Sequence, residues 1–394
     1  MKFSKWYVLV GALIIQMCLG VVYAWSVFLS PLMKEFGWAK TEASVAFTIA
    51  LVSFAGFMIF AGRLQDKLGP RLIATIGGVL LGLGFILARF TTSLWMLYIT
   101  YGVIAGAGIG FAYVCPIATL VKWFPQNKGL ISGIAVAGFG AGSLVFAPLA
   151  TSIIESTGWR SAFWILGLIF LVAVVLGAQL LRNPDAAYTK KKEALKTKKT
   201  EEIGWQEMLK RPVFWKLWVM FMFGATAGLM VIGHLAVFGR EGGLTPEVAA
   251  AAVGVLAIFN GLGRIIWGLV SDIFGRVNAM TIMFGVQALM MFLLIKMNTS
   301  FWMLAFAVAF VGFNFGGNFA LFPSATADNF GMKNMGANYG FMFTSYGFAG
   351  ILGPMLGAKV FDATQSYFLA FAIAGGLCVI AAILSRFRLA KKHS

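Results

Sequence analysis

Long apolar stretches, separated by short polar breaks, run along almost the whole chain. Each is about 18 residues long or more, which is the length an α-helix needs to cross the apolar part of a bilayer. The stretches are 6–28, 43–62, 72–90, 94–120, 129–151, 161–181, 213–238, 247–270, 278–296, 301–322, 336–358 and 367–385. The pattern therefore predicts an all-α membrane protein with twelve transmembrane helices.

The longest polar interruption covers residues 183–211 and is rich in lysine. With so little apolar content it cannot bury a core of its own. We expect it to be a cytoplasmic linker between an N-terminal half, 1–182, and a C-terminal half, 212–394, each with six predicted helices. Residues 204–215 have the pattern of a short amphipathic helix on the inner membrane surface, although a simple tether between the halves fits the same pattern.

Composition and charge agree with a membrane protein. Charged residues make up 11% of the chain, whereas a soluble domain carries about 25%. The net charge of +17 would fit a nucleic-acid-binding protein, but most of the lysine and arginine falls in segments that are cytoplasmic if the N-terminus is inside. This positive-inside distribution explains the charge without nucleic acid and places both termini in the cytoplasm. The short loops suit a bacterial inner membrane.

One charged residue lies inside an apolar stretch. Arg264 is the only charged residue between positions 250 and 270. A guanidinium keeps its proton in a protein, and placing it in hydrocarbon costs about 2.5–3.5 kcal/mol on insertion scales. A charge held at that cost usually faces a water-filled cavity, and its planar fork of donors matches a carboxylate. Arg264 therefore predicts a site for a small organic anion; an arginine bonded to helix carbonyls is the alternative.

The surroundings of Arg264 in the sequence support an anion site. No aspartate or glutamate lies in the middle of a predicted helix. Because a buried cation is unfavourable without a neutralising partner, we expect water or the substrate anion to neutralise the guanidinium. Asn260 lies one helical turn earlier on the same helix face, where it can hydrogen-bond a substrate oxygen.

A short motif follows the second predicted helix and returns after the eighth. Its pattern is G-x-x-x-D-x-x-G, with Gly62, Asp66 and Gly69 in the first copy and Gly268, Asp272 and Gly275 in the second. Glycine permits a tight turn and a close helix approach. The carboxylate can cap a neighbouring helix N-terminus or pair with arginine. We interpret four residues as gating and structural groups rather than substrate ligands: Asp66, Arg71, Asp272 and Arg276.

The doubled motif and the basic linker resemble the major facilitator superfamily. Finer motifs resemble its oxalate/formate antiporter and monocarboxylate transporter branches. These motifs are VVYAWSVFLSP at 21–31, WFPQNKGLISG at 123–133, FNGLGR at 259–264, ALFPSATADNFG at 320–331 and NYGF at 338–341. The resemblance covers nearly the whole chain. It implies a transporter of two six-helix halves that works by alternating access, with its site near the middle of the membrane.

The resemblance also bears on proton coupling. Monocarboxylate transporters of this kind often carry aspartate where this chain has Asn260, and that aspartate is proposed to work with the arginine. Asparagine cannot titrate. His234, in the seventh predicted helix, is then our candidate for the coupling group together with Arg264, and also a candidate substrate contact, because imidazole titrates near neutral pH. A hydrogen-bonded packing role for His234 is the alternative.

Aromatic residues are the remaining candidates for the substrate site. The resemblance implies that cavity-lining positions fall on their helices, although aromatic rings often pack in a core. The tyrosines are favoured because a buried hydroxyl needs a partner. The candidates are Tyr23, Tyr113, Phe315, Phe319, Phe343 and Tyr346.

Tyr346 has a consequence for substrate charge. In oxalate-transporting relatives, a lysine follows the NYGF motif by about one turn and helps to balance a dianion. This chain has Tyr346 at that place. One arginine matches one carboxylate, so we expect a monocarboxylate such as lactate or pyruvate rather than oxalate.

Other classes of function fit less well. An enzyme needs a nucleophile with a base, metal ligands or a cofactor motif, and the only histidines are His234 and His393. The three cysteines have no metal-ligand spacing. A channel would need a continuous polar lining, and a receptor on the same scaffold is a weaker alternative. We therefore expect a monomeric transporter without cofactor or metal that carries a monocarboxylate with a proton; anion exchange is the alternative.

Overall fold

The structure is a computed structural model that describes residues 4–185, 188 and 201–387. Within these residues every regular element is a helix. Twelve helical stretches are long and apolar enough to cross a membrane, which confirms the predicted fold class. They are Lys5–Phe36, Thr41–Leu68, Pro70–Ala88, Leu94–Trp123, Lys128–Thr157, Trp159–Gln179, Pro212–Glu241, Ala251–Phe274, Arg276–Leu294, Phe301–Phe330, Met335–Thr364 and Phe368–Arg386.

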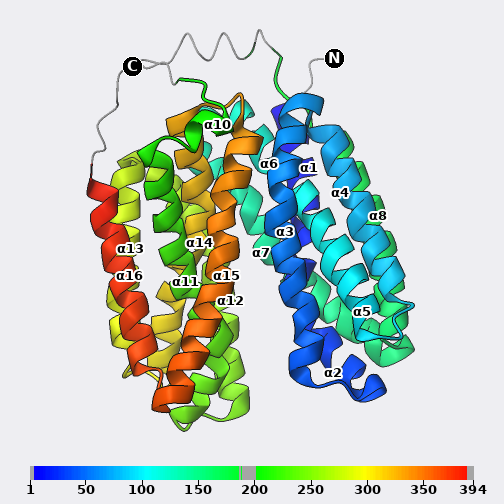
Figure 1. The fold of residues 1–394 in the computed structure, drawn as a ribbon, viewed down its shortest axis with the longest axis vertical. Coiled ribbons are helices and arrows are strands. Elements are labelled where there is room, and N and C mark those ends of the chain that lie inside the picture. Colours follow the sequence, from blue (N-terminus) through cyan, green and yellow to red (C-terminus); the bar gives the residue numbers. More distant parts are fainter. Residues whose placement is uncertain (1–3, 186–187, 189–200, 388–394) are drawn as a thin grey trace. The chain divides into compact units, whose positions relative to one another are not determined.

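The chain divides into two compact units, and Figure 1 shows the helices of each. Unit 1 contains the residues up to Pro125, Ala135–Trp205 and Phe330–Phe341; unit 2 contains Gln126–Ile134, Gln206–Asn329 and the residues from Met342 onward. The first turns of α7 (Lys128–Thr157) thus belong to unit 2, and those of α15 (Met335–Thr364) belong to unit 1.

Unit 1 owes its close packing to glycine. Besides most of α7 it holds α1 (Lys5–Leu19), η1 (Gly20–Ala24), α2 (Trp25–Phe36), α3 (Lys40–Leu68), α4 (Pro70–Ala88), α5 (Leu94–Leu97), the π-helical η2 (Tyr98–Ala105), α6 (Gly106–Trp123) and α8 (Trp159–Gln179). A Cβ on Gly108 of α6 would lie 2.3 Å from the backbone nitrogen of Leu81 in α4. Small residues let the backbones of membrane helices touch in this way.

Unit 2 has a core of large apolar side chains. Besides most of α15 it holds α11 (Pro212–Glu241), α12 (Pro246–Phe274), α13 (Arg276–Leu294), α14 (Phe301–Phe330) and α16 (Phe368–Arg386). Met230, Leu256, Met291 and Phe371, which come from four different helices, are buried together in this core. The helices therefore pack through side chains that lie far apart in the sequence.

The chain passes from unit 1 to unit 2 through the short helix α10 (Trp205–Met208). The predicted amphipathic helix over 204–215 is therefore too long. The helix α10 ends at Met208, and Pro212 prevents a continuous helix, because a proline ring disfavours the helical conformation of the preceding residue; Arg211 is extended, with φ −89° and ψ 128°. Proline has no N–H to lose at a helix start, so α11 begins there. The lysine-rich residues 189–200 lie outside the described residues.

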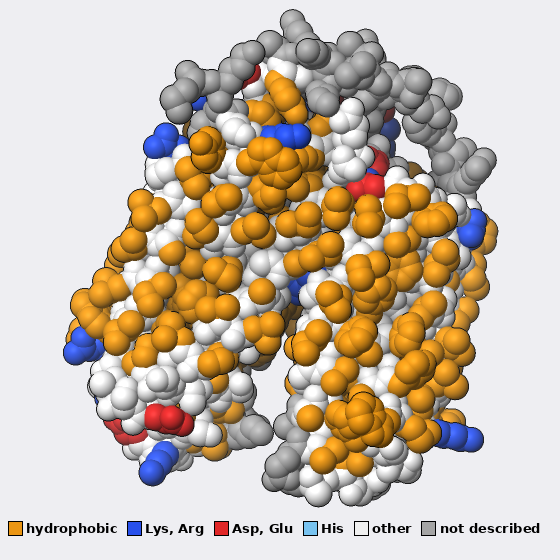
Figure 2. Space-filling model, turned by 180° about the vertical axis from the view of Figure 1, so that it is seen from behind, with side chains coloured by type: hydrophobic (Ala, Val, Ile, Leu, Met, Phe, Trp, Pro, Cys, Tyr) orange, Lys and Arg blue, Asp and Glu red, His pale blue; other side chains and the backbone are white. Residues whose placement is uncertain are grey.

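Apolar side chains cover the face of the molecule seen in Figure 2, and charged side chains gather toward its ends. On α12, for example, Ile258, Leu262 and Ile266 are exposed and follow one another at helical spacing. Exposed apolar side chains of this kind suit contact with lipid hydrocarbon.

Candidate functional site

Arg264 lies on the buried face of α12. Its side chain is 0% exposed, and Leu256 and Trp267 are buried on the same face. Among the described residues, Arg264 and Lys128 are the buried cations, and Lys128 is the first residue of its helix. Arg264 is ten residues before the end of α12 at Phe274, or about 15 Å along the helix axis at 1.5 Å per residue. It is thus the one buried charge in the interior of a described helix.

The guanidinium of Arg264 is oriented by two neighbours. Its Nε donates a hydrogen bond of 3.1 Å to Oδ1 of Asn260, one turn earlier. Its central carbon lies 4.7 Å from the centre of the Phe319 ring on α14. The hydrogen bond that Nε donates fixes the plane of the guanidinium, and an aromatic ring at this distance adds a cation–π attraction. The structure therefore brings together three of the predicted site residues, Arg264, Asn260 and Phe319.

Four aromatic residues of unit 2 form a cluster around Phe319. The Phe319 ring lies 5.3 Å from Phe315 and 5.3 Å from Tyr346, and Phe343 lies 5.0 Å from Tyr346. All four rings are nearly fully buried. We call Phe315, Phe319, Phe343 and Tyr346 the unit-2 aromatic cluster. It joins Arg264 through Phe319, so these predicted site residues share one region.

The two tyrosines predicted in the N-terminal half belong to a second cluster, within unit 1. Tyr23 and Tyr113 lie 5.3 Å and 5.2 Å from the Phe139 ring, and Tyr113 lies 5.0 Å from Phe54. We call Tyr23, Phe54, Tyr113 and Phe139 the unit-1 aromatic cluster. Phe54 and Phe139 were not among the residues predicted from the sequence.

The internal repeat contained the signal for both missed residues. With Gly62 aligned to Gly268, Phe54 corresponds to Asn260 and Tyr113 corresponds to Phe319. Alignment of NKG at 127–129 with NMG at 334–336 pairs Phe139 with Tyr346. Three members of the unit-1 cluster, Phe54, Tyr113 and Phe139, are thus the repeat counterparts of residues around Arg264, whose own position is taken by Met58.

A close helix crossing lies directly against Arg264. A Cβ on Gly133 of α7 would lie 2.1 Å from the carbonyl oxygen of Arg264, and one on Gly129 would lie 2.3 Å from that of Gly268. Both glycines belong to the part of α7 that packs in unit 2. Glycine is required here because the backbones are in contact, and the crossing ties the start of α7 to the arginine.

Unit 1 contains the counterpart of this crossing. A Cβ on Gly340 of α15 would lie 2.7 Å from the carbonyl oxygen of Met58, and one on Gly336 would lie 2.6 Å from that of Gly62. Met58 and Gly62 are on α3. The repeat therefore includes the helix crossings as well as the loop motifs.

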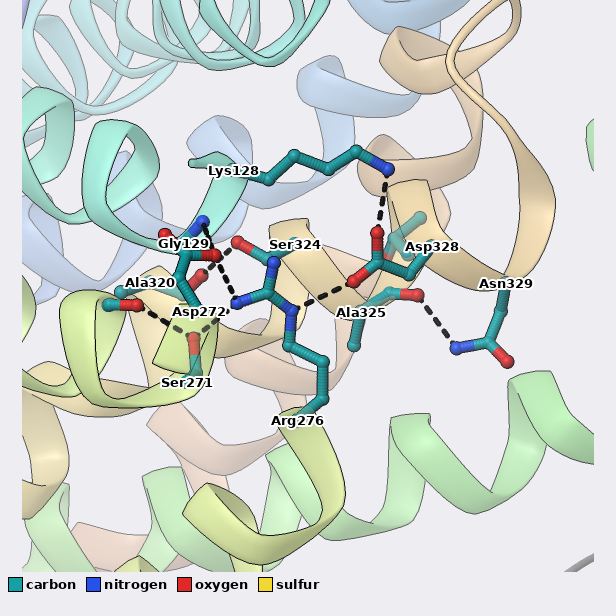
Figure 3. Close-up of polar contacts among 12 residues, drawn as sticks. Lys128, Gly129, Ser271, Asp272, Arg276, Ala320, Ser324, Ala325, Asp328 and Asn329 are labelled. Carbon is teal, nitrogen blue, oxygen red and sulfur yellow. Dashed lines mark hydrogen bonds and ion pairs between the residues drawn. The ribbon is translucent and has the colours of Figure 1, made fainter. Parts of the chain in front are cut away.

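The second motif loop caps α7 and holds a network of charges (Figure 3). The Asp272 carboxylate accepts hydrogen bonds from the backbone N–H groups of Gly129, at 3.0 Å, and Leu130, at 2.8 Å. Arg276 lies 2.7 Å from the same carboxylate and 2.8 Å from that of Asp328. Lys128 lies 2.6 Å from Asp328. Asp272 therefore both caps a helix N-terminus and pairs with arginine, the two roles considered for it.

The first motif loop caps α15 in the same way. Asp66 accepts from the N–H groups of Gly336, at 3.1 Å, and Ala337, at 2.7 Å. The ammonium of Lys122 lies 3.8 Å from the same carboxylate. A negative carboxylate at a helix N-terminus is stabilised by the unpaired N–H groups and the helix dipole. Both motif aspartates are thus bound to the start of a helix that is distant in sequence.

Arg71 lies elsewhere. Its Nε donates to Oε1 of Gln179 on α8, at 2.5 Å, rather than to the Asp66 carboxylate. In the aligned repeat, Pro70 rather than Arg71 is the counterpart of Arg276. One residue further along an α-helix is a rotation of about 100°, so Arg71 points to a different neighbour.

His234 lies in a separate part of unit 2. Its Nε2 is 2.9 Å from the carbonyl oxygen of Pro354, and its Nδ1 is 3.0 Å from the hydroxyl of Tyr367. A carbonyl only accepts, so Nε2 carries a proton, and in a neutral ring Nδ1 accepts from Tyr367. Burial raises the pKa of the Tyr367 hydroxyl, which keeps this donor protonated.

The helix positions separate His234 from Arg264. His234 is seven residues before the end of α11 at Glu241, and Arg264 is eighteen residues after the start of α12 at Pro246. The two helices run in opposite directions through a short turn. At 1.5 Å per residue, the two side chains differ by about 17 Å in depth. The structure does not bring His234 to the arginine.

The end of the linker makes contacts that the sequence did not predict. The Glu202 carboxylate accepts from the backbone N–H groups of Met332, at 3.2 Å, and Lys333, at 2.7 Å, in the loop between α14 and α15. The Arg63 guanidinium lies 3.8 Å from the centre of the Trp205 ring, which stacks on Phe341. All these residues belong to unit 1. The linker end is therefore attached to the start of α15, the same helix start that Asp66 caps.

Comparison with known proteins finds transporters. A model described as "Major Facilitator Superfamily" matches residues 9–294 and 230–394. The oxalate:formate antiporter of Oxalobacter formigenes is 35% identical over 362 residues, covering 91% of this chain and 85% of that protein. Monocarboxylate transporter 12-B of Danio rerio is 25% identical over 411 residues, covering 96% and 86%. Among solved structures, the transporter FucP in the outward conformation is similar in fold, with a TM-score of 0.75 at 16% identity over 99% of this chain and 100% of that chain.

Proposed function

The chain belongs to the major facilitator superfamily, and from that premise we propose that it is a secondary active transporter of small monocarboxylates such as lactate or pyruvate. Its relatives include an oxalate:formate antiporter and monocarboxylate transporters, as the sequence motifs indicated. The observation that carries the proposal is Arg264: a fully buried guanidinium in the interior of a membrane-spanning helix, with its plane held by Asn260. Its donors match a carboxylate.

We propose that the substrate carries a single negative charge. In the described part of unit 2, the interior of the helices provides one buried cation, Arg264. Tyr346, at the place where oxalate-transporting relatives carry lysine, contacts the same Phe319 ring as the arginine. Because Tyr346 is neutral, Arg264 alone would balance only one of the two charges of a bound dianion. Burying the second charge without a partner would cost free energy.

The two aromatic clusters and Asn260 are our proposed substrate contacts. Asn260 and the unit-2 aromatic cluster contact Arg264 directly or through Phe319. Tyr23 and Tyr113 stay in the proposal because the repeat relates their cluster to the residues around Arg264. A small carboxylate has a short apolar part, which rings can enclose, and polar groups that a tyrosine hydroxyl can bind.

We propose that transport is symport with a proton, and that His234 assists it. His234 can take up a second proton if the Tyr367 hydroxyl turns to accept from Nδ1, because a hydroxyl can donate or accept. Because His234 is far from Arg264, its protonation would not act on the bound carboxylate. It would instead change the contacts of α11 with Pro354 of α15 and with Tyr367. The other available proton carrier is the substrate carboxylate itself.

Anion exchange is the second candidate. It is favoured by the 35% identity to a protein named as an oxalate:formate antiporter. It is also favoured by the buried charge of Arg264, because an empty carrier would have to change conformation without a bound anion.

We further propose that the two capped helix starts act as gates. Each motif aspartate binds a helix start, Asp66 that of α15 and Asp272 that of α7. Arg276 supports the contacts of Asp272, and Arg71 would act through its hydrogen bond to Gln179 on α8. Alternating access requires contacts that form in one conformation and break in another.

The distribution of lysine and arginine leads us to place both termini in the cytoplasm of a bacterial cell.

Uptake into proteoliposomes tests the function. Vesicles without internal anion are given an acidic outside and labelled lactate, pyruvate, formate or oxalate. Symport predicts accumulation of a monocarboxylate against its gradient, and the Arg264→Gln variant, present at equal amount, should show none. Uptake that requires a preloaded counter-anion at every pH gradient would support exchange. Failure of every anion to accumulate under either condition would refute transport of this substrate class.

A further inference from the structure

A groove lies where α11 begins and α16 ends, far in sequence from the residues of the proposed substrate site. It has a volume of about 610 Å³ and is lined by Lys210, Pro212, Trp215, Lys216, Leu384 and Phe387. All of these residues belong to unit 2. We call this the α11–α16 groove. It opens at the end of the unit that carries the linker, the end predicted to be cytoplasmic.

The walls of the groove are apolar and its rim is basic. Trp215 is 49% exposed and Phe387 is 59% exposed, so described residues leave about half of each of these two large side chains uncovered. Lys210 is exposed, and the half-buried Lys216 donates a hydrogen bond of 3.0 Å to the carbonyl oxygen of Phe387. An ammonium has three N–H donors, so one such bond leaves others for an anion. The combination suits a ligand with an acidic head and an apolar chain.

The charges around the groove disfavour the protein's own C-terminal tail as its occupant. No acidic residue lines it, and the nearby Glu207 forms an ion pair with Arg211. The chain that follows Phe387 has the sequence RLAKKHS. A basic segment is repelled by Lys210 and Lys216, whereas a phosphate is attracted. Since basic pockets between helices at the cytoplasmic side of a membrane bind acidic headgroups, charge favours lipid over the protein's own tail.

We propose that the α11–α16 groove binds an anionic phospholipid, whose phosphate contacts Lys210 and Lys216 and whose acyl chain lies along Trp215 and Leu384. The indole N–H of Trp215 is already used, since it donates to the carbonyl oxygen of Leu209 at 2.9 Å; its ring therefore presents an apolar face to the chain. Bound lipid would join the start of α11 to the end of α16. This inference does not depend on the transported substrate.

Native mass spectrometry of the purified full-length protein in detergent tests it. Phosphatidylglycerol and phosphatidylcholine with the same acyl chains are titrated separately. A lysine near an anionic membrane surface contributes about 1 kcal/mol, so Lys210→Ala and Lys216→Ala should each weaken phosphatidylglycerol binding by roughly fivefold. Binding of phosphatidylcholine should be weaker from the start and should not change in either variant.

Two further variants separate the groove from general surface charge. Lys67→Ala removes an exposed lysine from α3 in unit 1 and should leave phosphatidylglycerol binding unchanged. Leu384→Trp fills the groove without changing any charge and should weaken binding. Equal binding of the two lipids, or the same loss in Lys67→Ala as in Lys210→Ala, would overturn the proposal. So would tighter lipid binding after removal of residues 388–394, because the tail would then be the occupant.

Discussion

The crossing of α7 on α12 predicts the effect of a single methyl group. In Gly133→Ala, the added Cβ would lie 2.1 Å from the carbonyl oxygen of Arg264. Ordinary contacts of carbon with other heavy atoms are about 3.5 Å long, so the two helices have to separate by roughly 1 Å. The neighbour is backbone and cannot rotate away. Overpacking of this kind costs about 1–3 kcal/mol.

The separation would act on both functional regions at once. It moves the backbone that carries Arg264, and it strains the two hydrogen bonds from the start of α7 to Asp272. A destabilisation of 1–3 kcal/mol shifts a two-state equilibrium by roughly 5- to 150-fold away from the state that contains the contact. We therefore expect substrate uptake to fall at least fivefold in Gly133→Ala, with a lower melting temperature in detergent.

A matched control lies on α12 itself. A Cβ on Gly261 has no atom within 4 Å, so Gly261→Ala adds the same methyl group without a clash. It should keep uptake and raise stability slightly, because alanine favours a helix over glycine by up to about 1 kcal/mol. The repeat counterpart Gly340→Ala, with a Cβ 2.7 Å from Met58, should impair transport less than Gly133→Ala. Uptake and melting of Gly133→Ala that match the unmutated protein would refute this account.

The remaining predictions concern substrate charge and coupling. Arg264→Lys keeps the charge but loses the fork, and since hydrogen bonds to charged groups contribute about 1.5–3 kcal/mol, lactate or pyruvate uptake should fall about tenfold or more at equal expression; normal uptake by Arg264→Gln would rule out the carboxylate contact. Tyr346→Lys should shift competition for uptake from monocarboxylates toward oxalate, and tight oxalate binding by the unmutated protein would contradict the assignment. His234→Ala should weaken uptake driven by an acidic outside but not counterflow, and Tyr367→Phe, which removes the acceptor for a protonated ring, should make uptake require a more acidic outside. Unchanged pH dependence in both variants would leave the substrate as the proton carrier.

The membrane spans could be predicted because hydropathy is local. Each span shows its length and composition within its own residues, and all twelve appear in the structure. Arg264 could be predicted for the same reason, as a charge inside one apolar helix. Helical spacing alone placed Asn260 on the same helix face as Arg264, and the structure adds the hydrogen bond between their side chains.

Contacts between distant segments could not be predicted in the same way. The contacts of Glu202 with the α14–α15 loop depend on how the linker folds back, and no local pattern shows this. Arg71 lies one position after the residue that aligns with Arg276, and one position corresponds to about 100° around a helix. Its side chain therefore contacts Gln179 instead of Asp66. His234 was assigned by titration chemistry, which says nothing about depth in the membrane.

The repeat suggests how one substrate site can arise from two similar halves. Both units contain a motif aspartate that caps a helix start and a pair of glycines in the first turns of that helix, where it crosses a neighbouring helix. Both units also contain an aromatic cluster. The shared parts are those that we propose to act as gates, and an alternating-access transporter would use a gate in each half. The parts that differ are Met58 against Arg264 and Phe54 against Asn260. Under the proposed function, a single charge on one of two similar helices would create the preference for an anion, while both units keep the same pattern of helix packing. If the charge is what distinguishes the two helices, substitutions at Met58 should affect stability through packing, whereas substitutions at Arg264 should affect which substrate is carried.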